Sequence, residues 1–438
     1  MTLRVSVIGT GYLGATHAAG MAEFGHEVIG LDIDPDRIAT LNSGRSPIYE
    51  EGLEPLLVRH TASGRLRFTT DYADIADWAD IHFLCLGTPQ SESGAADLSQ
   101  LHAAIDALAP LLTRPTLVVG KSTVPVGTAP ALLERLRAAA PAGEGVELAW
   151  NPEFLREAYA VDDTLRPDRI VLGVQSPNGA LDTLRRCYAI PISESVPVVT
   201  CDIATAELIK VAANAFLATK ISFINAMSRM CQAAGGDVTV LADALGHDKR
   251  IGREFLNAGL GFGGGCLPKD IRALAASASD HGVDVLADFI GTVEGINDAQ
   301  RHEVAELAVE QLDGNVTGRK IAILGAAFKP GTDDTRNSPA LTVATYLADA
   351  GADVWVYDPQ AAVRGRNITQ ANSIEEAFDG AELVLHLTEW PEFRHLDPAD
   401  VSDLVTNKVL IDGRLKLHRP TWTRAGWKVV QLGRAATL

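Results

Sequence analysis

The sequence predicts an α/β protein in which two Rossmann-like, doubly wound domains are joined by a central helical domain with a long helix. Toward each end of the chain, short apolar runs typical of buried strands alternate with turns and helical segments. Between these regions, residues 203–234 form a helical pattern that is apolar almost all round, which suits a helix buried between domains or subunits. At 438 residues the chain is long enough for several cores, and we expect domains over residues 1–200, 201–305 and 306–438.

The first elements carry a dinucleotide-binding fingerprint. A strand over residues 5–9 leads into Gly9-Thr-Gly11-Tyr-Leu-Gly14 and a helix to about Phe24, and a second strand over residues 27–32 ends in Asp32. Such glycines let a pyrophosphate approach the helix N-terminus. Asp32 can accept hydrogen bonds from both hydroxyls of an adenosine ribose and would repel a 2′-phosphate. We therefore expect the cofactor to be NAD rather than NADP.

Further strands of the first domain are predicted over residues 81–86, 116–120 and 170–173. Thr88 and Thr123 follow the first two of them. Because ligands of open α/β sheets bind beyond the carboxyl ends of the strands, these threonines are placed to touch the cofactor. The alternative is that they only cap turns.

The long central helix carries two polar residues that need an explanation. Lys210 and Asn214 are four residues apart and so share one face. A lysine among apolar residues is costly to bury without a partner or a function. Its side chain either has such a partner or extends along the helix to the surface.

A second α/β pattern begins near Arg319. Strands are predicted over residues 320–325, 353–359, 382–387 and 409–412, with a helix over residues 337–350. The loop over residues 325–336 stands where a dinucleotide loop would be but lacks the glycine fingerprint. It offers Lys329 and Arg336, which can hold phosphate or carboxylate groups.

The stretch GFGGGCLPKD, residues 261–270, predicts a reactive thiol. Its glycines let the backbone fold tightly around a ligand, and Pro268 suits the first turn of a helix. Cys266 then lies just ahead of the helix N-terminus, where the helix dipole favours a thiolate, and Asp270 can face the same side. The alternative is a small buried hydrophobic side chain. We interpret the other four cysteines as structural: Cys85, Cys187, Cys201 and Cys231.

Composition narrows the class of protein. The net charge of −18 disfavours nucleic acid and anionic membrane surfaces as partners. No apolar run reaches the length of a membrane span. The cysteines show neither a CxxC pattern nor Cys/His metal spacing, so we expect no metal site and a reduced, cytoplasmic protein. The apolar N-terminus resembles a signal peptide, but the strand and glycine pattern explains it better.

Together these features resemble the UDP-glucose 6-dehydrogenase group of nucleotide-sugar dehydrogenases, and the resemblance covers almost the whole chain. Its markers occur in the family's order: GTGYLG, GKSTVPVGT at residues 120–128, NPEFLRE at 151–157, ELIKVAANAFLATK at 207–220, GFGGGCLPKD and the loop 329–336. Two residues depart from the usual pattern, because Gly265 replaces a serine and Ala158 replaces a glycine.

The resemblance implies a twofold oxidation of the 6-hydroxymethyl group of a nucleotide sugar to a carboxylate by two NAD molecules. It makes Cys266 the nucleophile that adds to the intermediate aldehyde and becomes a thioester. Lys210 would stabilise the oxyanion and Asn214 would position it. Asp270 with Thr123 would hold a water, and Glu153 would help in thioester hydrolysis.

The binding residues that the resemblance implies fall into two sets. For NAD they are Gly9, Gly11, Tyr12, Leu13, Gly14, Asp32, Arg37, Thr88, Thr123, Glu157, Lys269 and Arg336. For the sugar nucleotide, expected to be UDP-glucose, they are Phe154, Leu155, Arg156, Glu157, Lys210, Asn214, Phe255, Leu256, Asn257, Ala258, Gly259, Gly263 and Lys329. Arg250 matches an arginine that reaches a neighbouring subunit's site, so we expect a homo-oligomer, at least a dimer.

Three other functions stay open. Within the family, the substrate can instead be GDP-mannose or a UDP-N-acetylhexosamine. A β-hydroxyacid dehydrogenase would transfer a single hydride and would leave the second Rossmann-like domain unexplained. A non-catalytic NAD-binding protein would not need Cys266, Lys210, Asn214 and Asp270 in their motifs.

Overall fold

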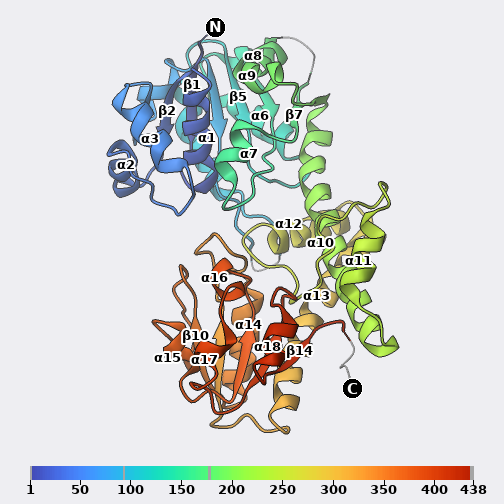
Figure 1. Cartoon of the computed structure of the whole chain (residues 1–438). Coiled ribbons are helices and arrows are strands. Elements are labelled where there is room, and N and C mark those ends of the chain that lie inside the picture. The colour runs from blue at the N-terminus through green and yellow to red at the C-terminus, as the bar shows by residue number, and fades with distance from the viewer. Residues whose placement is uncertain (1, 92–93, 176–178, 435–438) are drawn as a thin grey trace. The chain divides into compact units, whose positions relative to one another are not determined.

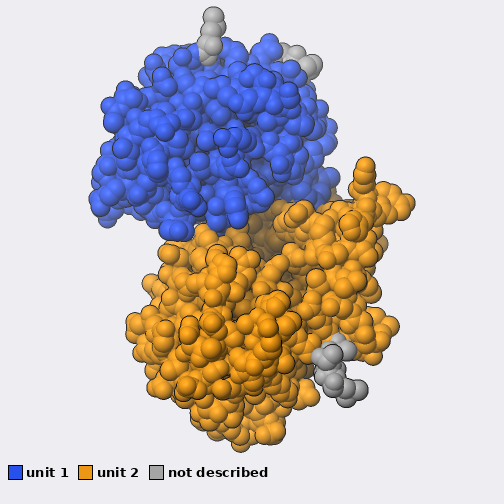
Figure 2. Space-filling view, viewed as in Figure 1, with its two compact units in different colours: residues 1–213 blue, residues 214–438 orange. Residues whose placement is uncertain are grey.

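The computed structural model describes residues 2–91, 94–175 and 179–434. The chain forms two compact units, residues 1–213 and 214–438, which Figure 2 shows in different colours. The boundary between them falls within the long helix α10 (Ile203–Ala234).

Unit 1 is built on an eight-stranded sheet in the order β3-β2-β1-β4-β5-β6-β7-β8 (Figure 1). The strands are β1 (Arg4–Ile8), β2 (Glu27–Leu31), β3 (Leu66–Thr69), β4 (Ile81–Leu84), β5 (Thr116–Gly120), β6 (Val146–Trp150), β7 (Ile170–Gly173) and β8 (Val198–Cys201). Neighbouring strands pair in parallel except β6 and β7, which pair antiparallel through Trp150 and Gly173. Because β1 is flanked by β2 and β4, the strand order reverses there, and ligands of such sheets bind at this switch point.

Helices cover both faces of this sheet. They are α1 (Tyr12–Glu23), α2 (Pro35–Asn42), α3 (Leu53–Ala62), α4 (Ala73–Ala76), α5 (Ser99–Leu108), α6 (Thr128–Ala139), α7 (Ala160–Leu165), α8 (Gly179–Cys187) and α9 (Ala189–Ser193), with short 3₁₀ helices at Ala109–Leu111 and Gly143–Gly145. Successive strand residues face opposite sides. Val7 and Phe83 pack with α1, α3 and α8, whereas Ile8 and Leu84 pack with α5 and α6.

Unit 2 combines helices with a six-stranded parallel sheet. The sheet order is β11-β10-β9-β12-β13-β14. The strands are β9 (Lys320–Leu324), β10 (Asp353–Tyr357), β11 (Ile368–Gln370), β12 (Leu383–His386), β13 (Val409–Asp412) and β14 (Lys428–Gln431). The helices besides α10 are α11 (Val238–Gly246), α12 (Leu267–Asp280), α13 (Asp284–Gln311), α14 (Pro339–Asp349), α15 (Ile374–Phe378), α16 (Pro391–Arg394), α17 (Pro398–Val401) and α18 (Arg419–Arg424). Their core joins α13 and α14 to the sheet.

The predicted fold class is confirmed, with two doubly wound sheets and a central helical region. The helix predicted over residues 203–234 coincides with α10, and the strands predicted over 116–120, 170–173 and 409–412 coincide with β5, β7 and β13. The division at residues 200 and 305 stays a prediction. Within the described ranges, no helix is long and apolar enough to cross a membrane.

Candidate active site

The turn between β1 and α1 contains glycines in two different environments. Gly11 has open space beside it, whereas Gly14 is packed tightly against the protein. Gly9 has a φ of +87°, which favours glycine. A Cβ on Gly14 would lie 1.7 Å from the carbonyl oxygen of Gly9, so close packing of the helix on the turn requires a glycine. A Cβ on Gly11, the residue that begins α1, would meet no protein atom within 4 Å. The open space at Gly11 faces a helix N-terminus, as a pyrophosphate site requires.

Asp32 follows β2 and is buried and well bonded. Its Oδ2 accepts hydrogen bonds from Thr10 N at 2.8 Å and from the Arg37 guanidinium at 2.8 Å. Its Oδ1 accepts one from Asp34 N at 3.1 Å and so keeps acceptor capacity for a ribose hydroxyl. Burial disfavours the charged form, but the hydrogen bonds from Thr10, Arg37 and Asp34 outweigh it and lower the pKa of Asp32. A fixed negative charge therefore stands at the strand end.

Thr88 and Thr123 lie beyond the carboxyl ends of β4 and β5 and next to each other. The Thr88 hydroxyl donates to the carbonyl oxygen of Thr123 at 2.8 Å. Thr88 thus has the turn-stabilising contact expected of a cap residue, and it also lies at the edge of the sheet where a dinucleotide binds.

Glu153 and Lys210 form a buried ion pair. Lys210 is only 4% exposed, so its side chain does not extend to the surface, and its Nζ lies 2.9 Å from Glu153 Oε1. Glu153 Oε2 accepts from Leu155 N at 2.6 Å, so that both carboxylate oxygens are held. Burial raises the pKa of Glu153, but Lys210 and the Leu155 N–H outweigh this effect and the pKa is lowered. Phe154 lies under this lysine, with Nζ 5.6 Å from the ring centroid.

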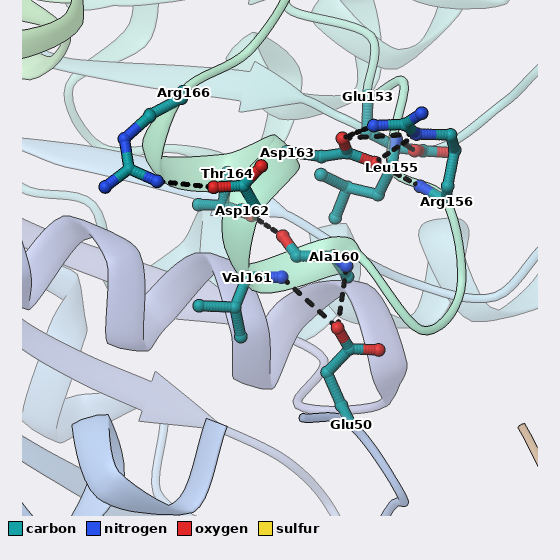
Figure 3. A network of polar contacts seen from close by, with 10 residues as sticks. All are labelled: Glu50, Glu153, Leu155, Arg156, Ala160, Val161, Asp162, Asp163, Thr164 and Arg166. Carbon is teal, nitrogen blue, oxygen red and sulfur yellow. Dashed lines mark hydrogen bonds and ion pairs between the residues drawn. The ribbon is translucent and has the colours of Figure 1, made fainter. Parts of the chain in front are cut away.

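The segment after Glu153 is held by its own chain. Figure 3 shows Arg156 against Asp163 and the Glu50 carboxylate accepting from Ala160 and Val161. The Arg156 guanidinium forms a two-pronged pair with Asp163, in which Nη2 donates to Oδ1 at 2.6 Å and Nε donates to Oδ2 at 3.0 Å. In this conformation Arg156, predicted to bind substrate, is engaged by the protein.

The hydroxyl of Tyr12, a predicted cofactor residue, donates a hydrogen bond to the Glu50 carboxylate. The backbone N–H of Ala158 donates to the Tyr12 hydroxyl oxygen and to Glu50 Oε2, each at 3.0 Å. Ala158 has a φ of +69°, in the left-handed region. The conformation explains why a glycine is common at this position, and it places a strained alanine next to a predicted cofactor contact.

Sequence reasoning missed a buried group next to Glu153. Lys121 Nζ donates to Asn151 Oδ1 at 3.1 Å and to the Tyr188 hydroxyl at 3.4 Å, and the Tyr188 hydroxyl donates to Asn151 Oδ1 at 2.5 Å. Burial lowers the pKa of Lys121. The signal was available in GKSTVPVGT, because a lysine directly after a buried strand has to lie at the carboxyl edge of the sheet.

In unit 2, Cys266 is the N-cap residue directly before α12, and it is exposed. Pro268 lies in the first turn of the helix, as predicted. Burial raises the pKa of Cys85 and of Cys187 to about 12. Cys231 is buried and Cys201 half-buried. Cys266 is therefore the accessible thiol among the five cysteines, all of which lie in the described ranges.

Asp270 is 1% exposed and connects two other predicted residues. Asn214 Nδ2 donates to Asp270 Oδ2 at 2.6 Å, and Lys269 Nζ donates to Asp270 Oδ1 at 2.7 Å. A buried carboxylate is stable only when it is bonded in this way. The α10 residue Asn214 and the start of α12 are thereby fixed to each other.

The glycine loop before Cys266 packs on the loop that carries Arg336. Gly264 N donates to the carbonyl oxygen of Arg336 at 2.9 Å, and a Cβ on Gly265 would lie 2.4 Å from the Arg336 guanidinium carbon. Gly265 therefore makes room for this side chain, which is paired with Asp334 at 2.6 Å. A serine at position 265 would displace Arg336, so this departure from the family pattern changes the position of a predicted cofactor residue.

The remaining predicted residues of unit 2 are in loops. Leu256 and Ala258 are buried, Gly259 N donates to Asn225 at 2.9 Å, and Lys329 Nζ lies 5.5 Å from the Phe328 ring. Arg250 is 88% exposed at its side chain and is paired with Asp248 at 2.6 Å. In the described ranges no cluster of three or more His, Cys, Asp or Glu residues is arranged to hold a metal ion.

Comparison with known proteins identifies the family. Residues 3–191 match the NAD binding domain of the UDP-glucose/GDP-mannose dehydrogenase family, residues 204–299 its central domain and residues 322–419 its UDP binding domain. A UDP-glucose 6-dehydrogenase of Bacillus subtilis is 40% identical over 443 residues, covering 100% of this chain and 99% of the relative. One of Haloferax volcanii is 43% identical, covering 94% of this chain and 96% of the relative.

Solved structures of similar fold also come from nucleotide-sugar dehydrogenases. A UDP-glucose dehydrogenase of Pyrobaculum islandicum has a TM-score of 0.90 at 36% identity and covers 100% of this chain and 98% of its own. A UDP-D-ManNAc dehydrogenase of Pyrococcus horikoshii has a TM-score of 0.88 at 28% identity, with 99% of each chain covered. From the glycine turn of the first sheet to the UDP binding domain of the second, this chain belongs to the UDP-glucose/GDP-mannose dehydrogenase family.

Proposed function

We propose that this chain is an NAD-dependent UDP-glucose 6-dehydrogenase, which oxidises the C6 hydroxymethyl group of UDP-glucose twice and releases UDP-glucuronate. The full-length similarity to enzymes of that name supports the substrate. The observation that carries the chemistry is the exposed thiol of Cys266 at the start of α12, because a twofold oxidation of an alcohol needs a nucleophile for its second half.

The residues of unit 1 fit NAD. The open space at Gly11 and the helix N-terminus suit the pyrophosphate, and ionised Asp32 suits the ribose hydroxyls. Bound NAD accepts the hydride in each oxidation. Thr88 and Thr123, at the carboxyl ends of β4 and β5, lie at the edge where this cofactor would be held.

We assign the chemical roles residue by residue from the family's motifs. The Cys266 thiolate adds to the aldehyde carbon and forms a thiohemiacetal, which loses the second hydride and becomes a thioester. Lys210 stabilises the negative oxygen and Asn214 positions it. Asp270 and Thr123 hold a water for proton transfer. Glu153, ionised and held at both oxygens, accepts a proton in thioester hydrolysis.

The remaining binding residues are assigned in the same way. Lys329 and Arg336 lie in the part of the chain that matches the UDP binding domain. Lys329 would hold the sugar nucleotide and Arg336 the cofactor.

A UDP-N-acetylhexosamine is the second candidate substrate, because the Pyrococcus horikoshii enzyme shares the fold over the whole chain. A panel of UDP-glucose, GDP-mannose and UDP-N-acetyl sugars with NAD and NADP decides between them. We expect two NADH per sugar and the highest kcat/KM with UDP-glucose and NAD. Higher kcat/KM with another sugar, preference for NADP, or one NADH per sugar would contradict the proposal.

We further propose that the chain forms a homodimer through α10. Phe216, Phe223 and Met230 are 65%, 48% and 59% exposed and recur every seven residues, so they form one apolar stripe on the helix. A two-fold axis would bury two copies of this stripe against each other. The exposed Cys266, which is in no disulfide, also favours the reducing cytoplasm as the compartment.

A further inference from the structure

A cavity of about 50 Å³ lies inside unit 1, on one side of Glu153. Its lining includes His17, Lys121 and Asn151, which are buried, and also Pro167 and Asp168. Asp168 is exposed, so the cavity extends from the interior to the surface. Glu153 and Tyr188 also line it.

The size and lining of this cavity suit water. One water needs roughly 10–15 Å³ and two to four polar partners. The Lys121 ammonium has three N–H donors. Among the described residues, Asn151 Oδ1 and the Tyr188 hydroxyl oxygen accept hydrogen bonds from it. Lys121 retains 7% exposure although it is in the interior, and its third donor is available to a water in the cavity. An apolar pocket would stay dry, whereas this one is lined by an ammonium, a carboxylate and a phenol.

The chemistry proposed above needs such a water. In thioester hydrolysis the water oxygen bonds to the thioester carbon, the carbon–sulfur bond breaks and the sulfur leaves as the Cys266 thiolate. The product is a carboxylate, so the two protons of the water are released, the first to Glu153. The two hydride transfers have by then been completed, and the hydrolysis consumes no oxidant.

We propose that this cavity is the passage through which water reaches Glu153 and protons leave it, with Lys121 as the residue that positions the water. The inference rests on the proposed function and adds a route and a residue to it. The lowered pKa of Glu153 agrees with this role, because an ionised carboxylate can accept the proton.

Two variants test the passage, one at a buried and one at an exposed lining residue. Lys121→Met keeps an unbranched side chain of similar bulk but removes the ammonium, and Asp168→Trp narrows the passage at an exposed position. Arg166→Trp is the matched control, because Arg166 lies in the same segment, is 73% exposed and does not line the cavity. Each protein is mixed rapidly with saturating UDP-glucose and NAD, NADH is followed by absorbance, and the thioester is measured by intact mass after acid quench.

We expect both test variants to release two NADH per chain at the rate of the unmodified protein. Their thioester should then decay at least about tenfold more slowly and accumulate, because a misplaced water costs roughly this much. Arg166→Trp should behave like the unmodified protein. If the thioester decayed at an unchanged rate in both test variants, the proposed passage would be wrong. It would also be wrong if the hydride transfers were slowed as much as the thioester decay. An unmodified protein that does not release two NADH per UDP-glucose would instead overturn the proposed function.

Discussion

At the scale of single residues, the accessibility of the thiols separates Cys266 from the other cysteines. Burial raises the pKa of Cys85 and Cys187 to about 12, so they stay protonated and inert at neutral pH. Cys266 is exposed at the first turn of α12, where the backbone N–H groups stabilise an anion.

We expect Cys266→Ser to stall as a covalent adduct or after one oxidation, because a hydroxyl ionises less readily than a thiol and an ester is a poorer acyl donor to water. Counting NADH per UDP-glucose and measuring the intact mass checks this. Cys201→Ser, at a half-buried position, serves as the control and should keep full turnover. Two NADH per sugar from Cys266→Ser at an undiminished rate would remove the covalent mechanism.

We expect Asp32 to set the preference for NAD over NADP. Asp32→Ala removes a buried charge that would repel a 2′-phosphate, and it releases the Arg37 guanidinium that now lies 2.8 Å from Asp32. We expect KM for NAD to rise about tenfold or more and the preference for NAD over NADP to shrink, since a charge-assisted hydrogen bond is lost and an arginine becomes available to phosphate. Steady-state kinetics with both cofactors measures this, with Asp36→Ala as the control. If the NAD/NADP ratio stayed unchanged, Asp32 would not be the discriminating group.

At the scale of elements, the turn between β1 and α1 contains a glycine required for packing, Gly14, and a glycine predicted to contact the cofactor, Gly11. Gly14→Ala would place a methyl group 1.7 Å from the Gly9 carbonyl oxygen, so we expect the unfolding free energy of unit 1 to fall by at least about 3 kcal/mol. Gly11→Ala meets no protein atom within 4 Å and should cost less than about 1 kcal/mol, but its methyl group would occupy the space of the pyrophosphate. Denaturant unfolding and NAD titration test the pair. If both variants lost the same stability, or if Gly11→Ala bound NAD with normal affinity, the assignment of Gly14 to packing and Gly11 to cofactor binding would be wrong.

The elements also show what could be predicted from the sequence and why. Apolar runs bounded by turn residues gave β5, β7 and β13 with their observed bounds, because buried parallel strands have a strong local signal. Five strands were not predicted: β3, β6, β8, β11 and β14. Four of them are short and partly exposed, whereas β6 is buried apart from Glu147, which interrupts its apolar run. The buried group formed by Lys121, Asn151 and Tyr188 was also missed, because residues up to 67 positions apart meet only through the order of the strands. Helix spacing singled out Lys210, Asn214 and Asp270, the family resemblance added Glu153 and the roles of all four, and the contacts among them come from the fold.

At the scale of the whole molecule, the net charge of −18 means that a negatively charged sugar nucleotide has to be held by local cations and backbone N–H groups. We expect Arg250 to be such a cation, although within its own chain its 88% exposed side chain pairs with Asp248 at 2.6 Å. An exposed pair of this kind contributes little to stability. The side chain is therefore available to a second copy of the chain, as the family resemblance implies.

If Arg250 completes the site of a neighbouring subunit, Arg250→Ala should raise KM for UDP-glucose about tenfold or more while the fold and the dimer persist, because a charged phosphate contact is lost. Complementation then tests the sharing directly. When Arg250→Ala and Cys266→Ala chains are coexpressed, each mixed dimer contains one site with both Cys266 and a partner's Arg250, so activity should recover toward half that of the unmodified dimer. Each variant alone provides the baseline. Arg253→Ala provides the control, because this nearby arginine is only 34% exposed, against 88% for Arg250. A fully active monomer at assay concentration, or no recovery in mixed dimers that demonstrably form, would show that each chain builds its site alone.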